Sequence, residues 1–166
     1  EIPFGRSKTF LDGVALVERT ALTVELTRGD TYNDYPALAA AADGSVWVSW
    51  ISYEDEKDAV WLARHDADGW GTPIRVSPAG EYTDNFRTAI AAGSGGRMVV
   101  VWSGKSPSDK WGIFSRVLDN GSLSEVASIG AAAENLYHRV TADSNANVHV
   151  AWQGFRGGVA KTLHSR

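Results

Sequence analysis

The sequence predicts an all-β protein assembled from repeated units, the blades of a β-propeller. A block of 32 residues occurs three times without a gap, starting at Asn33, Asn85 and Asn135. The starts lie 52 and 50 residues apart, a period typical of stacked or radially arranged units. Short apolar runs alternate with turn residues in each block, whereas no stretch shows a sustained helical pattern with capping residues. A helical solenoid is therefore excluded.

Five positions of the block are identical in all three copies, and they include one tryptophan. A β-sandwich also has short strands, but it does not place tryptophan at one fixed phase of a gap-free repeat. The repeat therefore favours a propeller over other β folds. The identical columns are Asn33/Asn85/Asn135, Ala40/Ala92/Ala142, Val48/Val100/Val150, Trp50/Trp102/Trp152 and Arg64/Arg116/Arg166.

The first copy shows the strands of one blade. Tyr35–Ala41 is short and apolar with an early proline, as at the start of a strand, and Asp43-Gly44 after it is typical of a hairpin turn. Ser45–Trp50 alternates apolar and polar side chains, as a half-buried strand does. With Ala59–Arg64 and Thr72–Ser77 the block holds four antiparallel strands, which is the pattern of a propeller blade.

The repeat predicts how much of a propeller the single domain, residues 1–166, contains. Residues 33–77 and 85–129 are complete blades, and residues 135–166 give three strands of another. Residues 13–27 resemble the outer two strands of a further blade. Gly13–Arg19 resembles the third strand of the repeat, including its final arginine, and Leu22–Thr27 lies where a fourth strand is expected.

Three blades are too few to close a ring, because propellers typically have four to eight. Open blade edges and bare apolar faces invite association. We therefore expect the propeller to be completed by a second copy of the chain, with Leu22–Thr27 closing the partner's last blade, or by the remaining part of a longer propeller.

Composition excludes several classes of function. The net charge of −4 and a pI near 5.5 leave no basic stripe for a nucleic-acid backbone. No apolar run is long enough to span a bilayer, and the absence of cysteine excludes disulfides and thiolate chemistry. The four histidines lack metal-ligand spacing, and the acidic run at residues 54–58 lacks the glycine of a calcium loop. We expect neither a metal nor a cofactor.

Functional residues are expected on the loops of one face, around the mouth of the central channel, because a rigid scaffold presents its loops. A residue that recurs in every copy is predicted to be architectural. The arginine column is thus expected to bond neighbouring backbone or a carboxylate. The asparagine column is expected to make turns, with one ligand site per blade as the alternative. The expected loops are residues 28–34, 51–58, 78–86, 103–110, 130–136 and 153–158.

Residues that break a column are the candidates for a binding site. Arg87 stands where the other copies have Tyr35 and Tyr137, at the start of the innermost strand. In the third copy, His138 and Arg139 stand one and two positions after this column, where the other copies have small or neutral residues. Two arginines here suit a carboxylate or phosphate. In the alternative interpretation the arginines line a solvated channel and pair with acidic neighbours. Those neighbours are Asp34, Asp84 and Glu134.

The segments Asp43–Trp50 and Trp70–Ser77, together with Pro36-Ala-Leu-Ala, resemble the repeats of secreted bacterial sialidase-like propellers. The resemblance implies an extracellular or periplasmic location and a glycan-related or scaffolding role. The chain departs from sialidases in two respects. It has no Ser-x-Asp-x-Gly-x-x-Trp turn, and only Arg87 and Arg139 can stand for the sialidase arginines, without a tyrosine–glutamate nucleophile pair.

Three functional hypotheses follow. The first is a binding or scaffold module whose loop face recognises a glycan or a protein partner. The second is a glycoside hydrolase that uses Asp34, Asp84 or Glu134 with Arg87 and Arg139, which requires two carboxyl groups about 5–10 Å apart. The third is a structural propeller fragment without a ligand.

Overall fold

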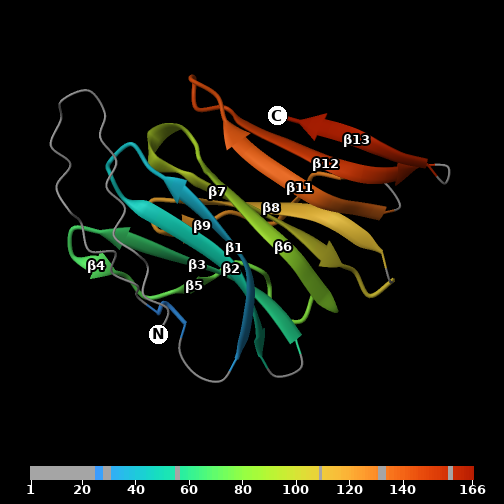
Figure 1. Ribbon diagram of the computed structural model, residues 1–166, viewed down its shortest axis with the longest axis horizontal. Coiled ribbons are helices and arrows are strands. Elements are labelled where there is room, and N and C mark those ends of the chain that lie inside the picture. The colour runs from blue at the N-terminus through green and yellow to red at the C-terminus, as the bar shows by residue number, and fades with distance from the viewer. Residues whose placement is uncertain (1–24, 28–30, 55–56, 109, 131–133, 157–158) are drawn as a thin grey trace, which may run out of the picture.

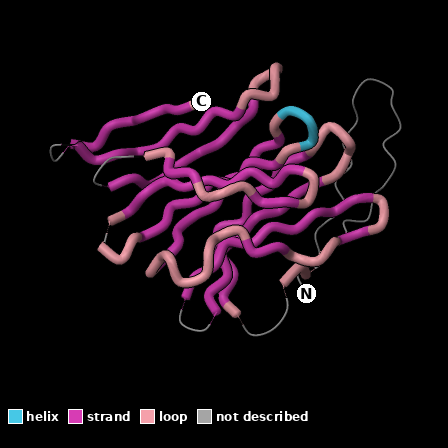
Figure 2. The backbone as a smooth tube through the Cα atoms, turned by 180° about the vertical axis from the view of Figure 1, so that it is seen from behind, coloured by secondary structure: helices cyan, strands magenta, loops and turns pink. Residues whose placement is uncertain are grey.

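The computed structural model describes residues 25–27, 31–54, 57–108, 110–130, 134–156 and 159–166. Its strands form three antiparallel sheets, one for each copy of the repeat, which lie face against face as consecutive blades of a β-propeller (Figure 1). Within the described residues the only helical segment is the single 3-10 turn η1(Ser94–Gly96), and the rest is strand, turn and loop (Figure 2). The predicted all-β propeller fold is confirmed.

We call the three sheets blades A, B and C in chain order. Blade A consists of β1(Tyr32–Ala40), β2(Val46–Glu54), β3(Lys57–Asp66), β4(Gly69–Trp70) and β5(Ile74–Arg75). Blade B consists of β6(Asp84–Ala92), β7(Met98–Lys105), β8(Trp111–Asp119), β9(Ser122–Leu123) and β10(Ala127–Ser128). Blade C consists of β11(Glu134–Ala142), β12(Val148–Arg156) and β13(Val159–Ser165).

The first strands of the three blades lie next to one another along the inner side of the array. β6 contacts both β1 and β11, as Figure 1 shows. Each first strand pairs antiparallel with the second strand of its blade, so the start of one lies beside the end of the other. We call this end of the blades, with the connections that leave from it, the loop face.

The predicted polar loop at residues 51–58 is wrong. Ile51–Glu54 continue β2, and Lys57 and Asp58 begin β3, so that residues 55–56 alone connect the two strands. Ile51 is 4% exposed and Ser52 is 2% exposed, because both lie in the packed part of the sheet. The serine and the acidic residues concealed a strand that continues four residues beyond Trp50, to Glu54.

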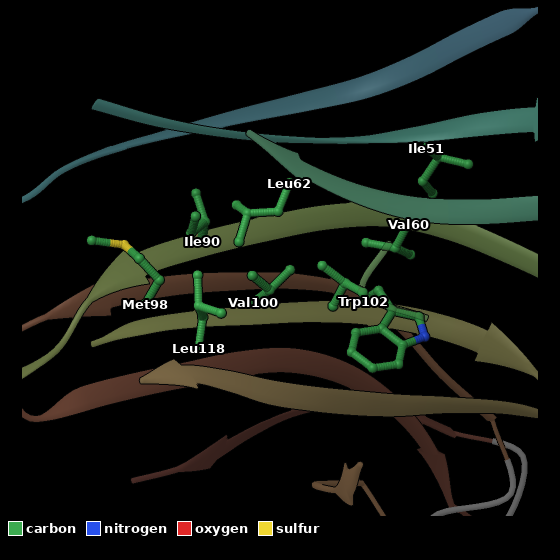
Figure 3. Packing of buried hydrophobic residues seen from close by; sticks show 9 residues of the cluster. Ile51, Val60, Leu62, Ile90, Met98, Val100, Trp102 and Leu118 are labelled. Atoms are coloured by element: carbon green, nitrogen blue, oxygen red, sulfur yellow. The ribbon is translucent and has the colours of Figure 1, made fainter. Parts of the chain in front are cut away.

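Two apolar cores join the blades. The core between blades A and B contains Ile51, Val60, Leu62 and Val76 from blade A and, from blade B, Ile90, Met98, Val100, Trp102 and Leu118 (Figure 3). The core between blades B and C is smaller and contains Val101, Ile113, Val150 and Trp152. In both, the invariant tryptophan points toward the preceding blade. The tryptophan column is therefore the packing element between blades.

Strand register shows that the gap-free repeat misplaces the third strand of blade B. Trp50 pairs with Trp61 and Trp152 pairs with Leu163, but Trp102 pairs with Phe114 rather than with Ile113. The connection before β8, residues 106–110, adds one net position to this copy. A shift of one residue sends every side chain of a strand to the other face. The true counterpart of Arg64 in blade B is thus Val117.

Two arginines of the repeated column, Arg64 and Arg116, bond a carboxylate or backbone as predicted, although they lie on different faces of their blades. Arg64 pairs with Asp43 at 3.1 Å and with Asp66 at 2.7 Å. Arg116 instead donates to two backbone carbonyls, that of Ser124 in its own blade and, at 3.0 Å, that of Val76 in blade A.

In blades B and C the asparagine of the repeated column connects the blade to the preceding one, which the prediction of simple turn residues missed. The side-chain amide of Asn85 donates to the carbonyl of Asp58 at 2.9 Å, and that of Asn135 donates to the carbonyl of Trp111 at 3.4 Å. Once the shifted register is applied, Asp58 and Trp111 occupy the same position at the start of the third strand. The asparagine is therefore an inter-blade clasp that occurs in both interfaces.

Candidate ligand site at the loop face

Each inner strand is interrupted at the same position by a β-bulge. The bulge residues are Tyr35, Arg87 and Tyr137, with φ of 52°, 53° and 57°, and in each blade the pairing register shifts by one residue there. Residues other than glycine seldom adopt positive φ. A bulge re-aims the side chain that it carries, and strained backbone of this kind concentrates at ligand sites. The column that sequence comparison singled out is thus also the geometrically unusual one.

The three bulge residues gather around Phe86. Tyr35 meets the Phe86 ring edge-on with centroids 4.8 Å apart, and Tyr137 does so at 5.9 Å from the other side. Trp111 adds a fourth ring, 6.1 Å from Phe86. Tyr35 is 41% exposed and Tyr137 is 50% exposed, so both residues are accessible from solvent. We call Tyr35, Phe86, Arg87 and Tyr137 the aromatic clamp.

Arg87 lies beside two rings of the aromatic clamp. Its guanidinium carbon is 5.8 Å from the centre of Phe86 and 5.9 Å from that of Tyr137. Cation–π contact at these distances is favourable but leaves the hydrogen-bond donors of the guanidinium free. Among the described residues, no carboxylate lies within ion-pair distance of Arg87 or of Arg139. Arg139 is exposed and donates to the carbonyl of His138 at 3.0 Å.

Carboxylates lie on the side of the loop face nearer to blade A. Asp58, at the start of β3, is half-buried, and its pKa is raised mainly by burial, with the charges of Asp84 and Asp34 adding to the effect. A hydrogen bond from the backbone N–H of Asn85, 3.0 Å long, opposes this increase. Asp34 and Asp84 are exposed, and Lys105 lies 3.9 Å from Asp84. Asp34 and Asp84 are thus both close enough to Asp58 to affect its pKa.

His138 is not at the surface of this site. Its side chain is fully buried between blades B and C, where Nε2–H donates to the carbonyl of Val101 at 3.2 Å and Nδ1 accepts from the hydroxyl of Ser103 at 3.1 Å. Burial lowers the pKa of His138 to about 4; the hydrogen bond to Val101 opposes this shift, whereas the nearby Arg87 and Arg139 contribute to it. The ring is neutral and structural at neutral pH.

The sequence candidates are therefore only partly brought together. Tyr35, Arg87 and Tyr137 form one cluster, and Asp34 and Asp84 lie near each other beside Asp58. Glu134 begins β11 opposite Phe155, and it forms no ion pair with another described residue. Sequence comparison missed Phe86 and Asp58. Phe86 directly precedes a column-breaking residue, which was the one available signal for it.

A resident metal finds no support in the described part of the chain. No group of three or more histidine, aspartate or glutamate side chains there is arranged to hold an ion. His149 and His164 stack at 5.4 Å and hydrogen-bond to each other, while His149 also reaches Asp143 at 3.1 Å. No helix of the described residues is long and apolar enough to cross a membrane.

Comparison with known proteins supports the fold. Neither a family model nor a curated protein matches the chain. Among solved structures, a Hadza microbial sialidase matches with a TM-score of 0.59 and 14% identity over 82% of this chain and 32% of its own. The endo-arabinase from Bacteroides thetaiotaomicron gives 0.58 and 13% over 80% and 55%, and B. megaterium levansucrase gives 0.57 and 11% over 75% and 41%. The chain spans between a third and about half of these proteins, and likeness at such identity shows the fold alone.

Proposed function

We propose that the chain is a saccharide-binding part of a β-propeller, with the aromatic clamp as its binding site. The observation that carries the proposal is the meeting of three re-aimed bulge residues around Phe86. Exposed aromatic faces stack on the apolar faces of sugar rings, and a few convergent polar groups fix the orientation of the ligand. Arg87 supplies free donors on one side, and Asp34 and Asp84 supply acceptors for hydroxyl groups on the other.

The names of the structural neighbours support the proposal, since a sialidase, an endo-arabinase and a levansucrase are enzymes that act on carbohydrates.

We extend the proposal to an extracellular or periplasmic location, where such ligands are found. Cell fractionation of the source organism with an antibody to this chain tests the location. A signal confined to the cytoplasm contradicts it.

A glycan array followed by calorimetric titration of each hit tests the binding function. Tyr137→Ala removes one face of the aromatic clamp and should weaken binding about 5- to 100-fold, which is ~1–3 kcal/mol for a lost stacking face. Tyr53→Ala, at the exposed end of β2 and outside the aromatic clamp, is the matched control and should bind as the original chain does. A blank array, or equal loss in both variants, contradicts the proposal and favours a structural fragment without a ligand.

One observation favours a second candidate function, glycoside hydrolysis. Burial raises the pKa of Asp58, which lies beside two exposed carboxylates, and a carboxyl group with a raised pKa paired with a second carboxylate is the usual arrangement for glycosidic bond cleavage. In this candidate Asp58 joins the predicted Asp34 and Asp84. The test is release of reducing sugar from the polysaccharides that bind, with Asp58→Asn as the inactive comparison. Binding without hydrolysis rejects this candidate and leaves the binding function intact.

A further inference from the structure

One face of blade A has no neighbouring blade among the described residues, whereas the same face of blades B and C is covered by the preceding blade. The face with the invariant tryptophan packs on the preceding blade at Trp102 and at Trp152. In blade A the same face gathers Val48, Trp50 and Ala63 with Trp61 and Trp70 around them. Beside them lies a hollow of about 480 Å³. Leu38, the counterpart of Ile90, is 69% exposed, against 6% for Ile90.

The polar groups of this face also lack the partners that the other two interfaces supply. Asn85 and Asn135 donate to a carbonyl at the start of the third strand of the preceding blade. Asn33 instead turns its amide back to Thr31, 2.8 Å from the Thr31 carbonyl. Among the described residues, Oδ1 of Asn33 and Nε1 of Trp61 are buried without a hydrogen-bond partner. A third strand with a free carbonyl is therefore the missing complement.

Another copy of blade C does not supply that complement. The outward face of blade C carries His149, Gln153, Thr162 and His164 where blade A has Trp47, Ile51, Val60 and Leu62. The blade A residues pack against blade B, whereas Thr162 and His164 are exposed. Packing such polar groups against Trp50 would bury them without partners, which is costly. A second copy joined head to tail is disfavoured for this reason.

The chain itself offers a segment with the required chemistry. Leu26, in the first described segment, already packs against Val48, Trp50 and Ala63, and 24 residues lie before that segment. In this stretch, outside the described residues, Gly13–Arg19 aligns with Asp58–Arg64 on its final arginine. Gly13 then takes the place of Asp58, the residue whose carbonyl binds Asn85.

We propose that Gly13–Arg19 is the third strand of a preceding blade and covers the open face of blade A within the same molecule. The carbonyl of Gly13 accepts a hydrogen bond from the side-chain amide of Asn33. Ala15 and Val17 take the places of Val60 and Leu62, which point toward the following blade. Ala15 and Val17 lie against Trp50 and Val48. The segment thus covers the tryptophan face of blade A as blade A covers the tryptophan face of blade B.

Disulfide trapping tests the proposal cleanly because the chain contains no cysteine. The test variant is Gly13→Cys with Asn33→Cys. Asp58→Cys with Asn85→Cys is the matched positive control, since those residues meet in the structure. Gly13→Cys with Asn145→Cys, which places a thiol on an exposed turn of blade C, is the negative control.

We expect mild oxidation to give an intramolecular disulfide in the test variant to at least half the yield of the positive control, and none in the negative control. Yield at the level of the negative control overturns the proposal. A disulfide between two molecules also overturns it and assigns the segment to a second copy.

Amide hydrogen exchange of the unmodified chain provides a measurement without any variant. Residues 14–18 should exchange at least 100-fold more slowly than an unstructured peptide, as β3 should. Exchange within seconds contradicts the proposal, even if both cysteine pairs fail to form a disulfide.

Discussion

The two blade interfaces are built from the same repeat but differ in what they bury. Between blades A and B, aliphatic side chains together with the rings of Tyr82 and Phe114 surround Trp102. The polar contact at the inner strand is between the hydroxyls of Ser49 and Thr88. Between blades B and C the apolar core is smaller, and His138 takes the position of Thr88. The same repeat can therefore form either an apolar interface or an interface that contains a buried histidine. The stability of the two should therefore respond differently to mutation and to pH.

The largest expected effect is loss of the apolar core. Trp102→Ala should lower the free energy of unfolding by ~3–5 kcal/mol, because a fully buried aromatic side chain leaves a cavity. Trp152→Ala should cost less, since the core around it is smaller. Urea unfolding followed by circular dichroism measures both. Equal losses would show that the interfaces are energetically alike.

Acid should weaken the interface between blades B and C selectively. His138 must be neutral when folded, and its pKa falls from an ordinary value near 6.5 to about 4. The unfolded chain then binds more protons than the folded one between these values, so stability decreases as pH falls from about 6.5 to about 4. The full shift corresponds to roughly 3 kcal/mol. Urea unfolding at several pH values should show this loss, and His138→Gln should remove it. A variant with the same acid sensitivity would assign the effect to other groups.

The asparagine clasps should also differ between the interfaces. Asn135 accepts a hydrogen bond from the Trp152 indole at 2.9 Å in addition to its donations, whereas Oδ1 of Asn85 and Nε1 of Trp102 have no partner among the described residues. Asn135→Ala should cost ~2–3 kcal/mol and Asn85→Ala ~1–2 kcal/mol, because buried groups that lose partners are expensive. The comparison uses the same unfolding assay. A larger loss of unfolding free energy for Asn85→Ala than for Asn135→Ala would show that the additional hydrogen bond of Asn135 does not stabilise its interface more.

The smallest expected effects come from the arginine column. Arg116→Ala removes two hydrogen bonds to backbone, one of which crosses to blade A, and should cost about 1–2 kcal/mol. Arg64→Ala removes ion pairs that solvent screens, so the loss should be smaller. If Arg64→Ala is the more damaging change, the ion pairs contribute more than exposed pairs usually do.

The oligomeric state of the chain tests whether the exposed face of blade A behaves differently from the covered faces of blades B and C. Gly13–Arg19 is proposed to cover the part of blade A's face around Trp50 and Val48, and the sequence predicts no inner strand of a preceding blade to cover the exposed Leu38, so we propose that the chain is not a lone monomer. Light scattering should give a mass above 17.9 kDa at micromolar concentration, and Leu38→Asp should reduce it. A mass of twice 17.9 kDa indicates a second copy, whereas insolubility without another chain indicates the rest of a propeller. A stable species of 17.9 kDa contradicts the proposal.

The candidate site was predictable only where it coincided with a break in the repeat. Arg87 differs from Tyr35 and Tyr137 at one column, and that column proved to be the bulge. His138 also breaks its column, yet it is buried, because residues on either side of a bulge point to different faces. Sequence comparison therefore found the position of the bulge but could not separate a residue at the loop face from the core residue beside it.

The propeller, the number of described blades, the invariant tryptophan and the hairpin turns between the first and second strands of each blade follow from the amino-acid sequence alone. Periodicity and turn chemistry are local, so they can be read along the chain. Only the tertiary structure decided which residues share a face. The one-residue shift in β8 moved Arg116 away from the counterpart of Arg64, and the bulges brought Tyr35, Arg87 and Tyr137 around Phe86. Register and bulges depend on hydrogen bonds between strands and on packing between blades, and neither leaves a fixed mark on a single strand.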